Sequence, residues 1–386
     1  MARVFGASRS ARWSLFAACL ALTALGAVAE DPPAAAPTPA PTAAPVPAPT
    51  PAPPPLELTS FVDAYYGYNF NHADSVLRNF DVQHNTFAIS LVEVAIEKKV
   101  APEGRVGFRA DINYGPTADM VAAFEPGQSG QDVFKHLQQG YLSVLAGAKL
   151  QLDAGKFVTP MGAEVIESKD NWNYSRSLLF ALAIPYYHVG VRASYPLHDK
   201  LSLNALAVNG WNNGSENNSG KTFALGATLK PTSKLSLAAT YMTGPEQLDD
   251  DDNWRKLFDT TVTLNPHPRV SLMANFDYGS DRVAGSSVKW FGIATYARLQ
   301  AMKGWFVSPR FEWLDDSDGF MTGTSQSLRE LTLTSDHKIA GDLTARIEYR
   351  RDLSDTAFFA STSNPQKKKS QSTLAVGLTY AFGGKI

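Results

Sequence analysis

The sequence predicts an all-β transmembrane antiparallel β-barrel of about 16 strands, within a range of roughly 14 to 18, from three observations. Segments of alternating apolar and polar residues recur, their connections are short and long by turns, and an aromatic residue stands where each long connection begins. In lipid a β-structure must close on itself to satisfy its backbone, and aromatic rings favour the edges of the apolar band. The aromatics are Tyr68, Tyr114, Phe157, Trp211, Tyr241, Tyr278, Trp313 and Tyr349.

The composition fits this class of protein. The 386 residues are 44% hydrophobic and 19% charged, with a mean hydropathy of -0.17. After residue 30 the longest apolar run is Leu178 to Ile184, far short of the ~18 residues of a spanning helix. A soluble β-sandwich also alternates apolar and polar residues. The clustering of aromatics at strand ends and the regular change of loop length favour the barrel.

Residues 1–29 have the pattern of a secretory signal peptide. Three arginines precede the apolar run 13–26, and Ala27-Val28-Ala29 is a typical cleavage site. The single cysteine, Cys19, lies within this segment, so we expect the mature chain to have no disulfide or thiol chemistry. The alternative is a lipoprotein with Cys19 as the lipidated residue.

Residues 30–55 predict a disordered linker rich in proline and alanine. Proline fixes φ and lacks an N–H donor, so such a segment is expected to be extended and without a core. Loss of the signal peptide removes three arginines and lowers the net charge from -2 to about -5. A mildly acidic chain argues against nucleic-acid partners. The barrel itself is predicted for residues 56–386.

The alternation is clearest in four segments. In 106–114, for example, Val106, Phe108 and Ala110 share one face, and Gly107, Arg109 and Asp111 share the other. The same pattern recurs in segments 270–278, 343–350 and 373–382. One face suits lipid and the other suits water. An even number of strands places both termini at the short-turn end, which is periplasmic in a bacterial outer membrane.

Several short motifs resemble the putative β-barrel porin-2, OmpL-like family. The resemblance covers about residues 58 to 382 and implies an outer-membrane barrel that acts as a porin. The chain departs from the usual pattern at its end, where four residues follow Phe382. The motifs are Gly155–Thr159 with Gly162 and Glu164, Asn173–Ser177, His188–Arg192, Asn209–Asn212, and Arg346–Arg350 with Asp352.

Charged residues on the polar faces are the candidates for lining the pore. A barrel of this size can hold a water-filled lumen, and charges in a pore set its ion preference. Arginines on one wall opposed by carboxylates would give a transverse field and a mild anion preference. The alternative is that these charges form salt bridges between neighbouring strands. The candidates are Arg105, Arg109, Asp111, Arg192, Arg310, Glu312, Arg346, Glu348 and Arg350.

The longest predicted loop, residues 158–186, is expected to narrow the pore. It contains the apolar run Leu178 to Ile184, which an outward loop would expose to water. We therefore expect the loop to fold into the barrel, although contact with another protomer would also cover the run. Its charged residues are Glu164, Glu167, Lys169, Asp170 and Arg176.

No motif indicates a cofactor or an enzyme. The four carboxylates Asp249, Asp250, Asp251 and Asp252 could bind Ca²⁺ or bridge lipopolysaccharide, but their spacing matches no calcium loop, and a solvated loop tip is the simpler interpretation. No G-x-S-x-G, H-E-x-x-H or phosphate loop is present.

The sequence therefore favours an outer-membrane porin for passive diffusion of small hydrophilic solutes or ions. Its expected partners are outer-membrane lipid, lipopolysaccharide, the solutes themselves and two further copies in a homotrimer. A plugged structural or adhesive barrel is the alternative, and an outer-membrane hydrolase is a third hypothesis.

Overall fold

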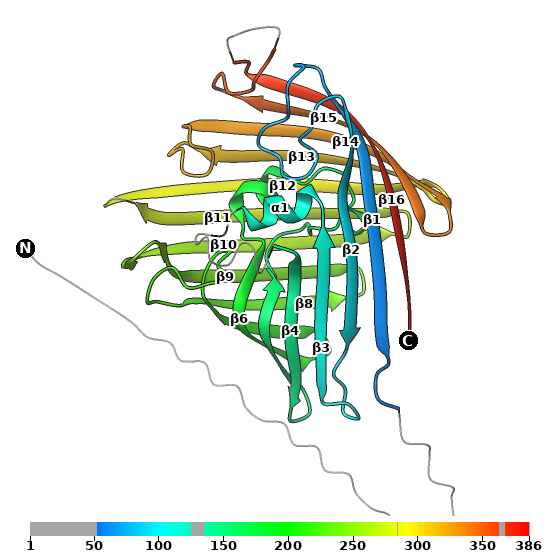
Figure 1. Ribbon diagram of the computed structural model, residues 1–386, viewed down its shortest axis with the longest axis vertical. Helices are drawn as coiled ribbons and strands as arrows, with labels where there is room; N and C mark the ends of the chain where they lie inside the picture. The colour runs from blue at the N-terminus through cyan, green and yellow to red at the C-terminus, as the bar shows by residue number, and fades with distance from the viewer. Residues whose placement is uncertain (1–51, 124, 126–134, 284, 363–366, 386) are drawn as a thin grey trace, which may run out of the picture. The chain divides into compact units, whose positions relative to one another are not determined.

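A computed structural model describes residues 52–123, 125, 135–283, 285–362 and 367–385. Sixteen antiparallel strands form one closed barrel in which each strand pairs with its neighbours in the chain (Figure 1). The predicted fold class and strand number are confirmed. The predicted signal peptide and most of the predicted linker, residues 1–51, lie outside the described residues.

The strand bounds are as follows: β1 Leu56–Asn69, β2 Thr86–Lys98, β3 Val106–Tyr114, β4 Leu137–Ala146, β5 Leu150–Val158, β6 Tyr187–His198, β7 Leu201–Val208, β8 Thr222–Thr232, β9 Leu235–Gln247, β10 Asp250–His267, β11 Val270–Val283, β12 Ser286–Met302, β13 Trp305–Asp316, β14 Gln326–Ala340, β15 Leu343–Ser354 and β16 Ser370–Lys385.

The barrel closes where β1 pairs with β16. Glu57 lies opposite Lys385 at one end of this pair, and Asn69 lies opposite Thr373 at the other. In Figure 1, β1 in blue runs beside β16 in dark red. The start of β1 and the end of β16 therefore share the end of the barrel that carries the short turns. Closure leaves no strand edge unpaired, as a bilayer requires.

Two connections at the long-loop end are shorter than the sequence predicts. Long connections are expected after the strand-end aromatics Tyr241 and Tyr278, but β9 continues to Gln247 and β10 begins at Asp250, while β11 continues to Val283 and β12 begins at Ser286. Asp249 occupies the turn between β9 and β10 with φ 55, in the left-handed region that Asp tolerates. Polar residues can continue the hydrogen-bonded pairing of these strands beyond the lipid, because water there hydrates their side chains.

Two of the eight strand-end aromatics do not face lipid. Phe157 is fully buried inside the barrel, and the Arg192 guanidinium lies 4.7 Å from its ring centroid. Trp211 follows the end of β7 and packs on the interior clusters. The interface prediction fails for these two because the inward loop supplies apolar partners inside the barrel. Tyr114, Tyr241, Tyr278 and Tyr349 are exposed, as the prediction requires.

In the residues that the structure describes, helical structure is confined to three short pieces: α1 Pro116–Ala122, the 3₁₀ turn η1 Ser168–Asp170 and the π-helical turn η2 Leu179–Ala183. Within the described ranges, no helix is long and apolar enough to cross a membrane. Both η1 and η2 belong to the connection between β5 and β6. They bring the longest loop into contact with the inner wall.

The buried core lies inside the barrel, since the outer face is a band of exposed apolar side chains. One cluster joins Phe80 of the β1–β2 loop, Val121 of α1 and Phe180 of η2. A second cluster joins Leu178 and Leu179 to Trp290 on β12. Loops from different parts of the chain thus pack together within the barrel and form the walls of the site described next.

Candidate functional site: the inward loop and its cavity

The connection between β5 and β6, residues 159–186, folds into the barrel. Its apolar run is buried: Leu178, Leu179 and Ala183 are each 0% exposed. The backbone N–H of Leu178 donates to the Glu312 carboxylate on β13 over 2.7 Å. A carboxylate that accepts backbone N–H groups at the start of a helical turn stabilises that turn. Glu312 thereby holds η2 against the wall.

Arg310 on β13 is the main ionic anchor of this inward loop. Its Nη1 lies 2.9 Å from the Glu164 carboxylate and also donates to the Ser175 carbonyl over 2.7 Å. Its Nε lies 3.0 Å from Glu312 and 3.1 Å from Glu330 on β14. The Arg310 side chain is fully buried. One guanidinium therefore joins two strands to the loop.

β15 supplies three more anchors. Glu348 accepts the backbone N–H groups of Tyr174 and Ser175 over 2.6 and 3.0 Å. Arg346 donates to the Asn171 carbonyl over 2.9 Å while its Nε pairs with Asp336 on β14. These side chains follow one another on the inward face, since residues two apart in a strand share a face.

The third anchor on β15 is Arg350. Its Nε lies 2.8 Å from Asp352, and its Nη1 donates to the Arg176 carbonyl of the inward loop. Asp352 also pairs with Arg78 from the β1–β2 loop over 3.0 Å. The ion pairs thus continue from the inward loop to a loop at the long-loop end, so the two loops share one polar network.

β1, which is separated from β15 by β16, supplies a further anchor of the inward loop. The Tyr174 hydroxyl and the Ser168 hydroxyl donate to the two oxygens of Asp63 over 2.9 and 2.8 Å. Burial raises the pKa of the Tyr174 phenol well above its ordinary value, and the nearby Asp63 carboxylate adds to the shift. Tyr174 therefore stays neutral as a donor. The loop is therefore fixed along one continuous arc of the wall, from β13 through β15 to β1.

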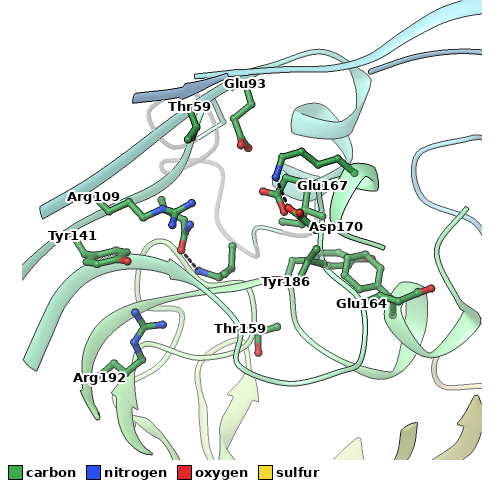
Figure 2. A pocket seen from close by; sticks show the side chains of 16 residues that line it. Thr59, Glu93, Arg109, Tyr141, Thr159, Glu164, Glu167, Asp170, Tyr186 and Arg192 are labelled. Atoms are coloured by element: carbon green, nitrogen blue, oxygen red, sulfur yellow. Dashed lines mark hydrogen bonds and ion pairs between the residues drawn. The ribbon is translucent and has the colours of Figure 1, made fainter. Parts of the chain in front are cut away.

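A cavity of about 330 Å³ remains between the inward loop and the wall formed by β1 to β6 (Figure 2). Arg109 of β3, Tyr141 of β4 and Arg192 of β6 line one side of it. The other side carries carboxylates from the loop and from β2. They are Glu93, Glu164, Glu167 and Asp170.

The two arginines of the wall are held in place by carboxylates beside them. Arg192 donates through Nε and Nη2 to Asp153, which is buried, over 3.0 and 2.8 Å. Arg109 donates through Nε to Asp111 over 2.9 Å. Both guanidinium groups remain partly exposed. Their positive charge therefore reaches the cavity, reduced by the partner carboxylates.

Glu93 lies on the acidic side of the cavity. It is 5% exposed, and its Oε2 has no hydrogen-bond partner among the described residues. Its carboxyl group contacts that of Glu167 on the inward loop, on the same side of the cavity in Figure 2. Lys169 pairs with Asp170 within the loop. A buried oxygen without a partner costs free energy, which makes this pole receptive to a donor.

A second cavity of about 480 Å³ adjoins the first and shares Thr59, Lys169 and Asp170 with it. Gly341, Asp342 and other residues of the short-turn end line it as well. The charged cavity therefore lies beside the mouth at the short-turn end of the barrel.

A family model described as putative beta-barrel porin-2, OmpL-like matches residues 55–382. The chain belongs to this family. No curated protein matches the sequence. The family match confirms the resemblance that the short motifs indicate, and with it the porin character of the barrel.

Solved structures share the fold at low sequence identity. The anion-selective porin from Comamonas acidovorans is 10% identical, with a TM-score of 0.58 over 85% of this chain and 99% of that one. The trimer form of OmpT from Vibrio cholerae has 10% identity and a TM-score of 0.57, over 85% and 99% of the two chains. The DcaP channel of Acinetobacter baumannii has 12% and 0.56, over 85% and 97%.

The structure separates the predicted pore-lining residues into three groups. Arg109, Asp111 and Arg192 lie at the wall of the charged cavity. Arg105 lies before β3 at the short-turn end, where it donates to the carbonyls of Leu145 and Gly147. The third group differs from the expectation of facing lumenal water, because the inward loop covers it. It comprises Arg310, Glu312, Arg346, Glu348 and Arg350, each at most 2% exposed.

The charged loop residues also separate. Glu167, Lys169 and Asp170 lie at the cavity. Arg176 instead turns back into its own loop, where it donates to the carbonyl of Val165 over 3.0 Å. Glu164 lines the cavity but is largely committed to Arg310 and to the Ser177 N–H. The sequence predicts that these residues share one loop. It does not show which of them line the cavity and which anchor the loop to the barrel wall.

Of the run from Asp249 to Asp252, Asp249 lies in the turn between β9 and β10, and the other three residues begin β10. Asp251 accepts the N–H groups of Ser219 and Gly220, and Asp250 accepts those of Asp252 and Asn253. These carboxylate oxygens accept hydrogen bonds from backbone N–H groups rather than converge on one metal position. In the described part of the chain, no group of three or more His, Cys, Asp or Glu side chains could hold a metal ion.

Sequence reasoning missed Glu93 on β2 and Asp63 on β1. Both lie at inward positions of their strands. The bulge between β1 and β2, at Asp63 and Ala64, shifts the parity of β2 and obscured the pattern. Ser90 and Leu91 are consecutive residues, and both are buried. Strict alternation along β2 would assign one of the two to the lipid-facing side.

Proposed function

We propose that this porin forms an aqueous channel in a bacterial outer membrane, with both ends of the barrel chain on the periplasmic side. The channel passes small hydrophilic solutes or ions by passive diffusion. The observation that carries the proposal is the charged cavity of about 330 Å³ beside an inward loop, inside a closed barrel of sixteen strands. The proposal includes no catalytic step.

The inward loop sets the size of the passage, because it occupies the barrel and is fixed to β1, β13 and β15. Arg109 and Arg192 on one side and Glu93 and Glu167 on the other produce a transverse field across the cavity. This supports the transverse-field hypothesis for the cavity. The buried pairs Arg310–Glu330 and Arg346–Asp336 support the salt-bridge alternative for β13 to β15.

Planar-bilayer recording tests the proposal. Stepwise openings in KCl, with conductance that falls as polymers of increasing radius are excluded, support a size-limited channel. Replacing residues 164–183 with a short glycine–serine linker should raise the single-channel conductance. The reversal potential in a salt gradient then reports ion preference, and strong cation preference would overturn the mild anion preference expected from the arginine wall.

The plugged barrel is the second candidate, and one relationship favours it. Arg78 of the β1–β2 loop pairs with Asp352, and Asn79 donates to Tyr186 at the end of the inward loop over 2.7 Å. The outer and inner loops therefore fill the interior together. A purified, folded barrel that never conducts in the bilayer, while the loop replacement does conduct, would favour the plug.

We also propose a homotrimer, supported by the unequal height of the wall. A rise of about 3.3 Å per residue and a tilt of roughly 40° give a nine-residue strand a height of only about 23 Å, against about 45 Å for eighteen residues. β3 and β5 have nine residues and β10 has eighteen. The short strands make the barrel wall low on one side, and such a side suits contact with neighbouring copies, which shield it from lipid. OmpT of Vibrio cholerae, which shares the fold, has a trimer form. Light scattering of detergent-purified protein tests this.

A further inference from the structure

The charged cavity has two poles of opposite sign, and this inference about its solutes rests on the proposed function. The basic pole consists of Arg109 and Arg192, from neighbouring parts of the β3–β6 wall. The acidic pole consists of Glu93 on β2 and Glu167 on the inward loop. Figure 2 shows the labelled arginines and these carboxylates on different sides of the same space.

Among the described residues, neither Glu93 nor Glu167 forms an ion pair with a cation. Oε2 of Glu93 is buried and has no hydrogen-bond partner among the described residues. Lys169 of the inward loop acts on Glu93 through its charge alone, because its ammonium group pairs with Asp170. Two carboxyl groups in contact share a proton and together carry about one negative charge, which an incoming ammonium group compensates while it donates up to three hydrogen bonds. Such hydrogen bonds between charged groups are the strong ones.

The basic pole is rigid and has donors to spare. Asp153 engages Nε and Nη2 of Arg192, which leaves Nη1 for a solute. The rings of Phe157 and Tyr141 lie 4.7 and 5.4 Å from the same guanidinium and hold its plane. Asp111 and Glu97 engage Nε and Nη1 of Arg109, which leaves Nη2. Two guanidinium groups can therefore receive a carboxylate.

We propose that the cavity favours small zwitterions, such as α-amino acids and dipeptides, over solutes of one charge. The solute ammonium group binds between Glu93 and Glu167, and its carboxylate binds Arg109 and Arg192. A volume of about 330 Å³ accommodates a molecule of this size. A solute with one charge engages one pole and is repelled by the other. A zwitterion engages both.

Permeation of four size-matched solutes into proteoliposomes tests this at neutral pH. The probes are glycylglycine as the zwitterion, N-acetylglycylglycine as the anion, glycylglycinamide as the cation and N-acetylglycylglycinamide as the neutral solute. The full chain should pass glycylglycine roughly threefold or more faster than each of the others, because opposite charges at both ends are compensated. The double substitution Glu93→Gln with Glu167→Gln removes the negative charge of the acidic pole and should lower the glycylglycine rate to that of the anion.

Two comparisons keep the test decisive. Glu103→Gln removes a carboxylate in the exposed β2–β3 turn and should leave all four rates unchanged. Each single substitution, Glu93→Gln or Glu167→Gln, leaves one carboxylate at the acidic pole and should lower the glycylglycine rate less than the double substitution does. Equal rates for all four probes, or a fastest rate for glycylglycinamide, would overturn the zwitterion proposal. KCl conductance of the same protein separates this failure from failure of the channel itself, which would give no openings.

Discussion

Arg310 on β13 and Glu164 on the inward loop form an ion pair of 2.9 Å, with both side chains almost fully excluded from solvent. This pair joins two parts of the chain that are 146 residues apart. Water cannot replace either partner once the loop is in place. The loop therefore behaves as part of the barrel wall rather than as a flexible plug.

Arg310→Met should release the inward loop. The substitution leaves Glu164, Glu312 and Glu330 without their shared cation in a buried site. Removal of one partner from a buried ion pair typically costs about 3 to 5 kcal/mol of folding free energy. Urea-dependent unfolding from lipid vesicles measures the loss, and single-channel traces should become noisier.

The matched control for Arg310→Met is Lys99→Met. Lys99 pairs with Glu57 over 2.8 Å at the short-turn end, but the Lys99 side chain is exposed and that of Glu57 is partly exposed. Exposed pairs contribute less than about 1 kcal/mol, so this variant should match the parent protein. Equal stability of the two variants would contradict the role assigned to Arg310.

Leu179→Ala should loosen η2 without changing charge. Leu179 is fully buried against Trp290 and its neighbours, so the substitution leaves a cavity and costs about 2 to 5 kcal/mol. Leu248→Ala is the control, since Leu248 is 68% exposed in the β9–β10 turn. Thermal unfolding followed by circular dichroism should separate the two. A Leu179 variant as stable as the control would place the apolar run outside the core.

Gly377→Val should displace Tyr174 from the wall. A Cβ at Gly377 on β16 would lie 2.6 Å from ring atoms of Tyr174, and the buried ring has no room to retreat. The hydrogen bond from Tyr174 to Asp63 should then be lost and the loop should shift on the β1 side. Higher or less regular conductance is expected. Gly384→Val, where an added Cβ meets no heavy atom within 4 Å, should conduct as the parent does.

Tyr174→Phe should reduce the loss of stability at alkaline pH. Burial first, and then Asp63, raise the pKa of Tyr174 in the folded protein above its unfolded value of about 10. The folded state therefore favours the neutral phenol, and stability that is full below pH 10 is lost as pH rises above it. Other buried tyrosines contribute to the same loss, so the measured quantity is the difference in unfolding free energy between parent and variant from pH 8 to 11. A constant difference over this range would contradict the assigned shift.

Particular residues show how far sequence reasoning reached. Alternation placed Arg346 and Glu348 on the inward face, and the apolar run 178–184 indicated that its loop turns inward. Neither pattern shows which strands of the barrel the inward loop contacts. Arg310 and Arg192 are both inward arginines on strands, yet the first is a buried anchor and the second faces a cavity. That distinction depends on where the loop lies across the barrel.

The sequence by itself determined the antiparallel barrel, its sixteen strands and the ends at which the chain enters and leaves, because alternation and turn chemistry are local properties. Only the tertiary structure decided which polar side chains meet water, because loop 159–186 crosses the lumen and contacts strands β1, β13 and β15, which are distant in the chain. The same crossing brings Glu93 and Glu167 together opposite Arg109 and Arg192. Burial of a charge depends on what packs over it, and local sequence holds no record of that.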